Sequence, residues 1–249
     1  LADYDISAFR KLSQLFAFTS HVTLPSIIFE EIITDFKRID AGLAITADRQ
    51  TLDLMNKIMR EWLSGFRITD ENFRPHHGPG GIAETGRTSL YEKYDLLGFD
   101  RVISECFRWH NISLEKYFMK TQSTSRVSRL VAVPKSTLTS RTICMEPATL
   151  QFLQQGVLGA IADWSSCHPV LRRHIRLNDQ EVNMDAARQG SLFGELATID
   201  LSAASDSVSW TLVRDIFKGT DYLQWCLATR SRAVQLPSDE IIQLNKFAP

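Results

Sequence analysis

The first part of the chain alternates apolar and polar residues with the period of an amphipathic helix. Between residues 47 and 64, apolar side chains recur three and four positions apart, which places them on one helical face. Thr46 stands where an N-terminal cap is needed, and Gly65 stands where a helix can end. We therefore expect a helix over 47–64 whose apolar face points into the core. Weaker patterns of the same period predict helical structure over 5–18, 26–38 and 98–118.

The pattern changes in the middle of the chain, where short strands are predicted. Residues 127–133 and 141–145 are rich in apolar and β-branched residues, and they flank a turn-rich stretch at 134–140, which predicts a strand–loop–strand. Residues 195–201 form an apolar run that predicts a buried strand. Further helices are predicted over 148–164, 179–189 and 206–217. Because mostly helical segments come first and mixed strands and helices follow, the predicted fold class is α+β.

A loop interrupts these patterns between residues 70 and 90. Residues 74–81 read Arg-Pro-His-His-Gly-Pro-Gly-Gly, and this run cannot lie inside a helix or a central strand. Long ordered loops are often functional. The run lacks the Lys-Ser/Thr pair of a P-loop and follows no predicted strand, so it does not indicate a nucleotide site of that type.

Composition excludes several classes of protein. The 249 residues are 44% hydrophobic and 23% charged, which is ordinary for a globular protein and not for a disordered or fibrous one. No apolar run reaches the roughly 18–20 residues that a membrane helix needs, so we expect no membrane partner. The 4 cysteines are widely spaced, which favours a reducing, cytoplasmic setting. The chain begins with Leu1 and ends at Pro249 directly after an apolar stretch, so we expect a part of a longer protein.

Charge is unevenly distributed although the net charge is only −1. Residues 120–145 contain no acidic residue, and this stretch covers the predicted strand–loop–strand. A locally basic surface can hold a polyphosphate or a nucleic-acid backbone, or it can simply be solvated, and charge alone does not separate the two. The basic residues of the stretch are Lys120, Arg126, Arg129, Lys135 and Arg141.

Two carboxylates mark the candidate chemistry. Asp200 closes the predicted strand over 195–201, and Asp206 follows after a turn of small residues. A carboxylate at the end of a buried strand is rigidly held beside a cleft, where Mg²⁺ takes one or two protein carboxylates. Asp206 would then lie beside the first carboxylate without chelating the same ion. The alternative is that Asp206 caps the following helix and Asp200 is an edge carboxylate, and the spacing alone favours this alternative.

Four segments in order along the chain resemble motifs of RNA-directed RNA polymerases. More narrowly, the chain resembles the replicase catalytic subunit of small positive-strand RNA bacteriophages of the levivirus type. The similarity is strong over residues 74–210 and weak over residues 1–70. The segments are residues 77–80, which resemble an upstream loop; 133–147, the basic finger motif; 177–180 with Asn183, the segment before motif A; and 198–209, motif A itself.

The resemblance implies a right-hand polymerase fold with fingers, palm and thumb. Residues 1–70 would form an N-terminal helical region, 71–192 the fingers with the basic strand–loop–strand, and 193–249 the start of the palm. The chain would be truncated before the second palm motif and the thumb. The implied activity is replication of a phage RNA genome, in which ribonucleotides are added to an RNA 3′-hydroxyl by two-metal nucleotidyl transfer.

The resemblance also assigns roles to individual residues. Asp200 would be the catalytic residue that binds Mg²⁺, with two ions expected in the full-length enzyme. Asp206 would face the ribose 2′-hydroxyl and favour ribonucleotides over deoxyribonucleotides. Lys135 and Arg141 would hold the nucleoside triphosphate. For Arg126 and Arg129 the roles of template contact and plain solvation stay equal.

The departures from the family pattern lead to a further expectation. The family's third palm motif, Gly-Asp-Asp, supplies the other metal carboxylates, and this chain contains no Asp-Asp pair. Residues 246–249 resemble the run into the second palm motif. We therefore expect these 249 residues to be catalytically inactive in isolation.

Partners follow from the resemblance alone. They are template RNA, ribonucleoside triphosphates, the bacterial elongation factors Tu and Ts and a ribosomal protein, in the cytoplasm of the infected host. A non-catalytic RNA-binding or host-factor-docking module is the main alternative. A reverse transcriptase palm is disfavoured, because Ser202, Ala203 and Asp206 leave a polar, open site where enzymes that use deoxynucleotides place a bulky group.

Overall fold

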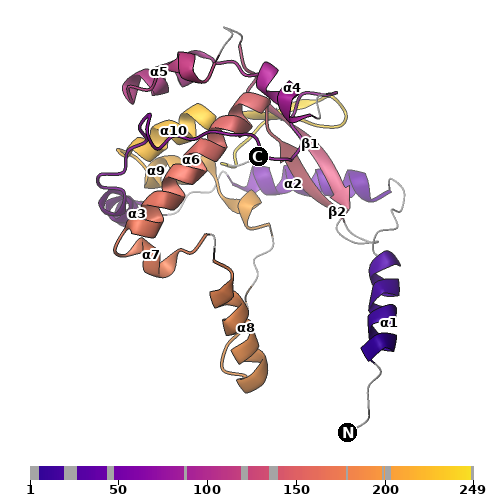
Figure 1. The fold of residues 1–249 in the computed structure, drawn as a ribbon. Helices are drawn as coiled ribbons and strands as arrows, with labels where there is room; N and C mark the ends of the chain where they lie inside the picture. Colours follow the sequence, from indigo (N-terminus) through magenta and orange to yellow (C-terminus); the bar gives the residue numbers. More distant parts are fainter. Residues whose placement is uncertain are drawn as a thin grey trace.

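The structure is a computed structural model, in which helices surround a small sheet (Figure 1). It describes residues 6–19, 27–43, 48–86, 89–118, 123–134, 140–177, 179–197, 199 and 203–247. The α-helices are α1 (Ile6–Thr19), α2 (Ile27–Gly42), α3 (Arg49–Trp62), α4 (Leu90–Asp95), α5 (Arg101–Trp109), α6 (Ala148–Cys167), α7 (Leu171–His174), α8 (Glu181–Phe193), α9 (Trp210–Ile216) and α10 (Asp221–Thr229). The 3₁₀ helices are η1 (Leu114–Lys116) and η2 (Ser205–Ser207). The strands are β1 (Val127–Pro134), β2 (Ser140–Met145), β3 (Ala233–Gln235) and β4 (Ile241–Gln243). The α+β prediction is confirmed.

Helix α3 forms where its apolar spacing predicts, but its cap differs. The carboxylate of Asp48 accepts a hydrogen bond from the backbone N–H of Thr51, so the helix begins at Arg49. The expected cap, Thr46, lies outside the described residues. Past the helix end, Gly65 has a φ of 85°, a conformation that glycine adopts without strain.

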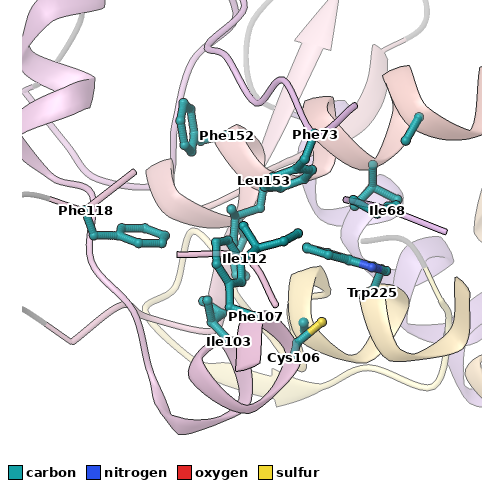
Figure 2. Packing of buried hydrophobic residues seen from close by; sticks show 14 of the residues in the cluster. Ile68, Phe73, Ile103, Cys106, Phe107, Ile112, Phe118, Phe152, Leu153 and Trp225 are labelled. Atoms are coloured by element: carbon teal, nitrogen blue, oxygen red, sulfur yellow. The ribbon is translucent and has the colours of Figure 1, made fainter. Parts of the chain in front are cut away.

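The main core lies between α6, α5, α10 and the segment around residues 66–73. The rings of Phe73, Phe107 and Trp225 pack together there, with centroid distances of 4.8 Å from Phe73 to Trp225 and 5.6 Å from Phe107 to Trp225 (Figure 2). Leu150 and Leu153 enter the same cluster from α6 and are fully buried. This cluster holds α5, α6 and α10 together.

The sheet has the strand order β2-β1-β3-β4. β1 and β2 are antiparallel, with Arg129 opposite Met145 and Pro134 opposite Ser140, so the predicted strand–loop–strand is confirmed. β3 runs parallel to β1 and antiparallel to β4. Neither β3 nor β4 is among the predicted elements. Their pairing joins segments from both sides of residue 193 in one sheet.

Helix α2 packs against this sheet and closes a second, smaller core. Phe36 on α2 is buried together with Leu130 of β1 and Val234 of β3, and Leu236 and Leu244 complete the cluster. α1 and α8 project away from this body (Figure 1). No helix within the described residues is both long and apolar enough to cross a membrane.

The predicted buried strand over 195–201 is wrong for the part of it that the structure describes. Residues 195–197 and 199 are not in a strand. The side chain of Leu196 is 51% exposed and that of Ile199 is 84% exposed. The physical reason is that a strand is held by a hydrogen-bonded neighbour, and none of the sheet's strands pairs with residues 195–197 or 199.

The helix predicted over 206–217 is shorter than expected. It begins with the single 3₁₀ turn η2, and the α-helix α9 starts only at Trp210. Ser209 is the N-cap residue, and its hydroxyl accepts a hydrogen bond from the backbone N–H of Leu212. Val213 and Ile216 are buried, whereas Val208 lies before the helix and is 36% exposed.

Candidate active site

Two of the predicted site residues, Asp200 and Lys135, lie outside the described residues, and their roles stay predictions. Arg141 lies on β2, opposite Val133 of β1, one position from the end of the ladder that Pro134 closes. Its side chain is exposed. Arg141 is therefore accessible to solvent close to the loop that joins β1 and β2.

Arg126 is held within the protein by hydrogen bonds. Its Nε and Nη2 donate to the two carboxylate oxygens of Asp100, at 2.5 and 2.9 Å. The remaining N–H groups donate to the backbone carbonyls of Leu227 and Arg230 from Nη1 and of Ala228 from Nη2. A guanidinium has five donors, so these bonds occupy all of them. They fasten the start of β1 to the end of α10.

Arg129, the other predicted template contact, has a different environment. Its Nη2 donates to the carbonyl of Ile82 at 3.3 Å. Its Nε is buried and has no hydrogen-bond partner among the described residues. The side chain lines a hollow of about 480 Å³ between β1 and the turn that joins β3 to β4. Of the two arginines, Arg129 is the one with a donor to spare.

Asp206 is paired with a buried lysine. It lies in η2 and does not cap α9, since that cap is Ser209. The ammonium of Lys246 donates to Asp206 Oδ1 at 2.7 Å. The Lys246 side chain is 2% exposed, against 29% for Asp206, and the ammonium lies 4.0 Å from the centre of the Phe36 ring. The structure thus places a fixed positive charge behind the carboxylate that the resemblance assigns to ribose recognition.

The backbone around Lys246 is held by two neighbouring segments. Asp40 on α2 accepts hydrogen bonds from the backbone N–H groups of Asn245, at 3.0 Å, and of Lys246, at 2.9 Å. The segment also pairs with the start of α9, because Trp210 N–H donates to the Asn245 carbonyl and Ser209 forms an antiparallel bridge with Lys246. This arrangement joins α2 to the motif that contains Asp206.

A buried charged cluster lies beside this segment, next to a cavity of about 280 Å³. Arg230 donates to the Lys246 carbonyl at 2.8 Å, and its guanidinium lies 4.7 Å from the centre of the Trp210 ring. Burial lowers the pKa of Arg230 to about 10. Burial also raises the pKa of Glu146, although the Ser231 hydroxyl donates a hydrogen bond to its carboxylate.

The loop that resembles the family's upstream motif is fixed by Lys93 of α4. This buried lysine donates to the carbonyls of Gly78, at 2.9 Å, and Gly80, at 2.5 Å. His77 is buried between aromatic rings, and burial lowers the pKa of its imidazole. The loop's glycines and prolines indicated an irregular backbone, but no local signal pointed to Lys93 as its anchor.

The same loop is joined to the basic finger motif. The carboxylate of Glu84 accepts a hydrogen bond from the N–H of Ala148 at 3.0 Å, which satisfies a free donor at the start of α6. Ala83 N–H donates to the Glu146 carbonyl at 2.9 Å. The residues that follow the 77–80 segment therefore lie beside the end of the basic finger motif.

No three His, Cys, Asp or Glu residues gather into a metal-binding group within the described ranges, which leave out Asp200. Within the described part of the chain, the ion-pair partner of Asp206 is the ammonium of Lys246. An adjacent positive charge disfavours a cation at the same oxygen atoms. The ammonium of Lys246 therefore disfavours a metal ion at Asp206 Oδ1.

Comparisons with known proteins agree with the motifs. The family model of the RNA replicase beta-chain matches residues 106–249. The RNA-directed RNA polymerase subunit beta of Escherichia virus Qbeta is 35% identical over 124 residues, which are 50% of this chain and 20% of that protein. The corresponding beta chain of Enterobacteria phage GA is 38% identical over 121 residues, 46% of this chain and 21% of that protein. That of Escherichia phage MS2 is 45% identical over 86 residues, 32% of this chain and 14% of that protein.

The matches with Qbeta and GA span about a fifth of the length of those relatives. The family model covers more than half of the chain, including the basic strand pair and the Asp200–Asp206 motif. The predicted resemblance is confirmed, and the chain belongs to the RNA replicase beta-chain family.

Proposed function

We propose that this chain is part of an RNA-directed RNA polymerase that copies a positive-strand RNA phage genome. The observation that carries the proposal is the single family match over residues 106–249, which contains the basic strand pair and the motif with Asp200 and Asp206 in the family's order. In this proposal residues 1–70 are an N-terminal helical region, 71–192 the fingers and 193–249 the start of the palm of a right-hand fold.

Arg141 and Lys135 bind the triphosphate of the incoming nucleotide. Arg141 supports this role because it is exposed on β2 close to the loop between the basic strands. A guanidinium matches the geometry of phosphate oxygens with two parallel hydrogen bonds, and an ammonium adds a point charge. Arg129 is the proposed template contact, since its side chain lines a hollow beside β1.

Asp200 is the proposed metal ligand, and Asp206 binds the ribose 2′-hydroxyl. Bound Mg²⁺ would supply charge stabilisation at the transferring phosphoryl group. The protein's own contribution is to orient the nucleotide, with Arg141 at the phosphates and Asp206 at the sugar. The ion pair of Asp206 with Lys246 supports this division, because the ammonium occupies a carboxylate oxygen that a metal ion would need.

The 249 residues alone are proposed to be inactive, because Asp200 is the only metal carboxylate that the resemblance assigns within them. Template RNA and ribonucleoside triphosphates are the proposed substrates. Elongation factors Tu and Ts and a ribosomal protein are the proposed partners, in the cytoplasm of the infected bacterium. The relatives' printed names describe RNA-directed RNA polymerase subunits, which supports the substrates and leaves the host factors to experiment.

The test is Asp200→Asn in the full-length polypeptide, assayed for templated incorporation of ribonucleotides with Mg²⁺. We expect a loss of at least about a hundredfold, because a metal at the transferring group contributes several kcal/mol. Asp185→Asn is the matched control, since Asp185 is an exposed carboxylate on α8, and its activity should be unchanged. If Asp200→Asn retains full activity, the assignment of Asp200 fails. If the wild-type protein binds RNA but incorporates no nucleotide, the non-catalytic RNA-binding alternative replaces the polymerase.

A further inference from the structure

Lys246 is one of the least exposed charged residues in the described chain. Its side chain is 2% exposed, its ammonium donates to Asp206 Oδ1 at 2.7 Å, and the same ammonium lies over the ring of Phe36. Burying an ammonium is costly unless a partner compensates it. Among the residues that the structure describes, the carboxylate of Asp206 and the ring of Phe36 offset this cost. With the Lys246 side chain only 2% exposed, the pair is not a solvated surface contact.

The position of Lys246 does not depend on Asp206. Its backbone N–H is held by Asp40, and its carbonyl accepts from Arg230 at 2.8 Å. Ser209 adds the antiparallel bridge from the start of α9. Three separate elements therefore fix the residue that carries the ammonium.

Asp206 is less constrained than its partner. It lies in the short turn η2, directly after a segment in which Ala203 has a φ of 51°, and its side chain is 29% exposed. A carboxylate on such a turn has several orientations of similar energy unless something selects one of them. The rigid ammonium of Lys246 makes that selection.

We infer that Lys246 is a positioning residue for ribose discrimination, which rests on the proposed function of Asp206. The ammonium occupies Oδ1 and holds the carboxylate so that its other oxygen accepts the 2′-hydroxyl of the incoming nucleotide. A hydrogen bond to an ionised acceptor is about twice as strong as one between neutral groups. A site built around such a bond rejects a substrate that lacks the hydroxyl.

A positioning role of Lys246 can be distinguished from a purely structural role by comparing the effect of its loss on two substrates. A ribonucleotide uses the oriented carboxylate, whereas a deoxyribonucleotide has no 2′-hydroxyl to present to it. Loss of Lys246 should therefore lower kcat/KM for ribonucleotides and leave the value for deoxyribonucleotides nearly unchanged. A general loss of packing would lower both values by the same factor.

The experiment measures both kcat/KM values in the full-length polypeptide with its partners, for the wild type and for Lys246→Met. We expect the preference for ribonucleotides to fall by about tenfold, which is a part of the large preference that such a hydrogen bond can provide. Lys37→Met is the matched control, because Lys37 lies on α2 beside Phe36 and forms an exposed ion pair with Glu240. The control should leave the preference unchanged.

Two further variants show whether the proposed role of Asp206 or the inference about Lys246 is wrong. They are Asp206→Asn and the double variant that combines it with Lys246→Met. If Asp206→Asn does not change the preference, the proposed role of Asp206 is wrong. If Asp206→Asn lowers the preference and Lys246→Met does not, only the inference about Lys246 is overturned. In support of the inference, Lys246→Met should have no further effect on the preference when Asp206 is already Asn.

A second variant keeps the test decisive if Lys246→Met does not fold. Lys246→Gln retains a hydrogen-bond donor near Asp206 and removes the charge. We expect a smaller fall in the preference for ribonucleotides with this variant than with Lys246→Met. An unchanged preference in folded Lys246→Gln overturns the inference.

Discussion

Arg126 and Arg141 carry the same guanidinium, and the protein uses the two side chains in different ways. Arg141 is exposed on β2, whereas Arg126 gives all its donors to Asp100 and to carbonyls near the end of α10. Although burial opposes ionisation of Asp100, hydrogen bonds from Arg126 and from the N–H of Ile103 lower the pKa of this carboxyl. The charge pattern of the sequence thus indicates a basic region, and the tertiary structure decides which of its arginines can bind a ligand.

The first prediction at this scale concerns Arg126→Met. It should lower the free energy of unfolding by about 3 kcal/mol, because Asp100 keeps its charge in a partly buried position without its partner. Urea denaturation measures the change. Since the pKa of folded Asp100 is depressed, the pair's contribution is complete above the unfolded pKa and is lost as the pH falls through the folded pKa. The difference between wild type and variant should therefore shrink under acid conditions.

Arg101→Met is the control for this substitution. Arg101 pairs with Glu105 on the surface of α5, with side chains 89% and 50% exposed, and such pairs contribute about 0.5 kcal/mol or less. A variant Arg126→Met that is as stable as the wild type but binds RNA more weakly would contradict the structural role and make Arg126 a template contact.

At the scale of elements, the two faces of helix α6 differ in the side-chain size that they tolerate. It contains Gly156 and Gly159, which look equivalent in the sequence. A Cβ at Gly156 would lie 2.5 Å from the ring of Phe73, whereas a Cβ at Gly159 meets nothing within 4 Å. The first glycine lets the helix approach the core closely, and the second only weakens the helix.

Two alanine substitutions on α6 test this difference. Gly156→Ala should lower the free energy of unfolding by about 1–3 kcal/mol, because the added methyl displaces the buried ring of Phe73. Gly159→Ala should raise it by about 0.5–1 kcal/mol, because alanine has less backbone freedom to lose and no clash. Thermal and urea unfolding of the two variants provide the comparison. Equal effects of the two substitutions would contradict the packing of α6 against Phe73.

At the scale of the whole molecule, the cysteines are distributed among different parts of the fold. Burial raises the pKa of Cys106 on α5, Cys144 on β2 and Cys226 on α10 to about 12 in each case. Cys167, at the end of α6, is exposed. Cys106 and Cys226 are buried, and Cys144 is half-buried. The thiolate is the reactive form, so these three thiols report on unfolding of the core and the sheet.

Alkylation by iodoacetamide at pH 8 should therefore modify Cys167 rapidly and the other three cysteines only after unfolding. Mass spectrometry of peptides after increasing urea follows each site. Cys106 and Cys226 should become reactive together, since both lie on helices that pack on the core around Trp225. Cys167→Ser should abolish the rapid reaction, and rapid labelling that persists in this variant would show that a buried thiol is accessible in the folded protein.

The sequence was most informative where a structure depends on neighbours along the chain. The helix over 47–64, the strands at 127–133 and 141–145 and the loop at 74–81 follow from periodicity and from the conformational limits of proline and glycine, and the structure contains all of them. The order of the motifs also indicated the replicase family correctly. These features depend on local stereochemistry and on residue identity, and both can be determined from the sequence alone.

Only the tertiary structure decided which residues become partners over long separations. The parallel pairing of β1 with β3, the clamp between Arg126 and Asp100 and the ion pair of Lys246 with Asp206 have no local signal. The apolar run at 195–201 shows the opposite case, because its described residues remain outside the sheet despite a strand-like pattern. A strand or a buried charge is stable only when another segment supplies its hydrogen bonds, and where that segment is distant along the chain, folding alone brings it into place.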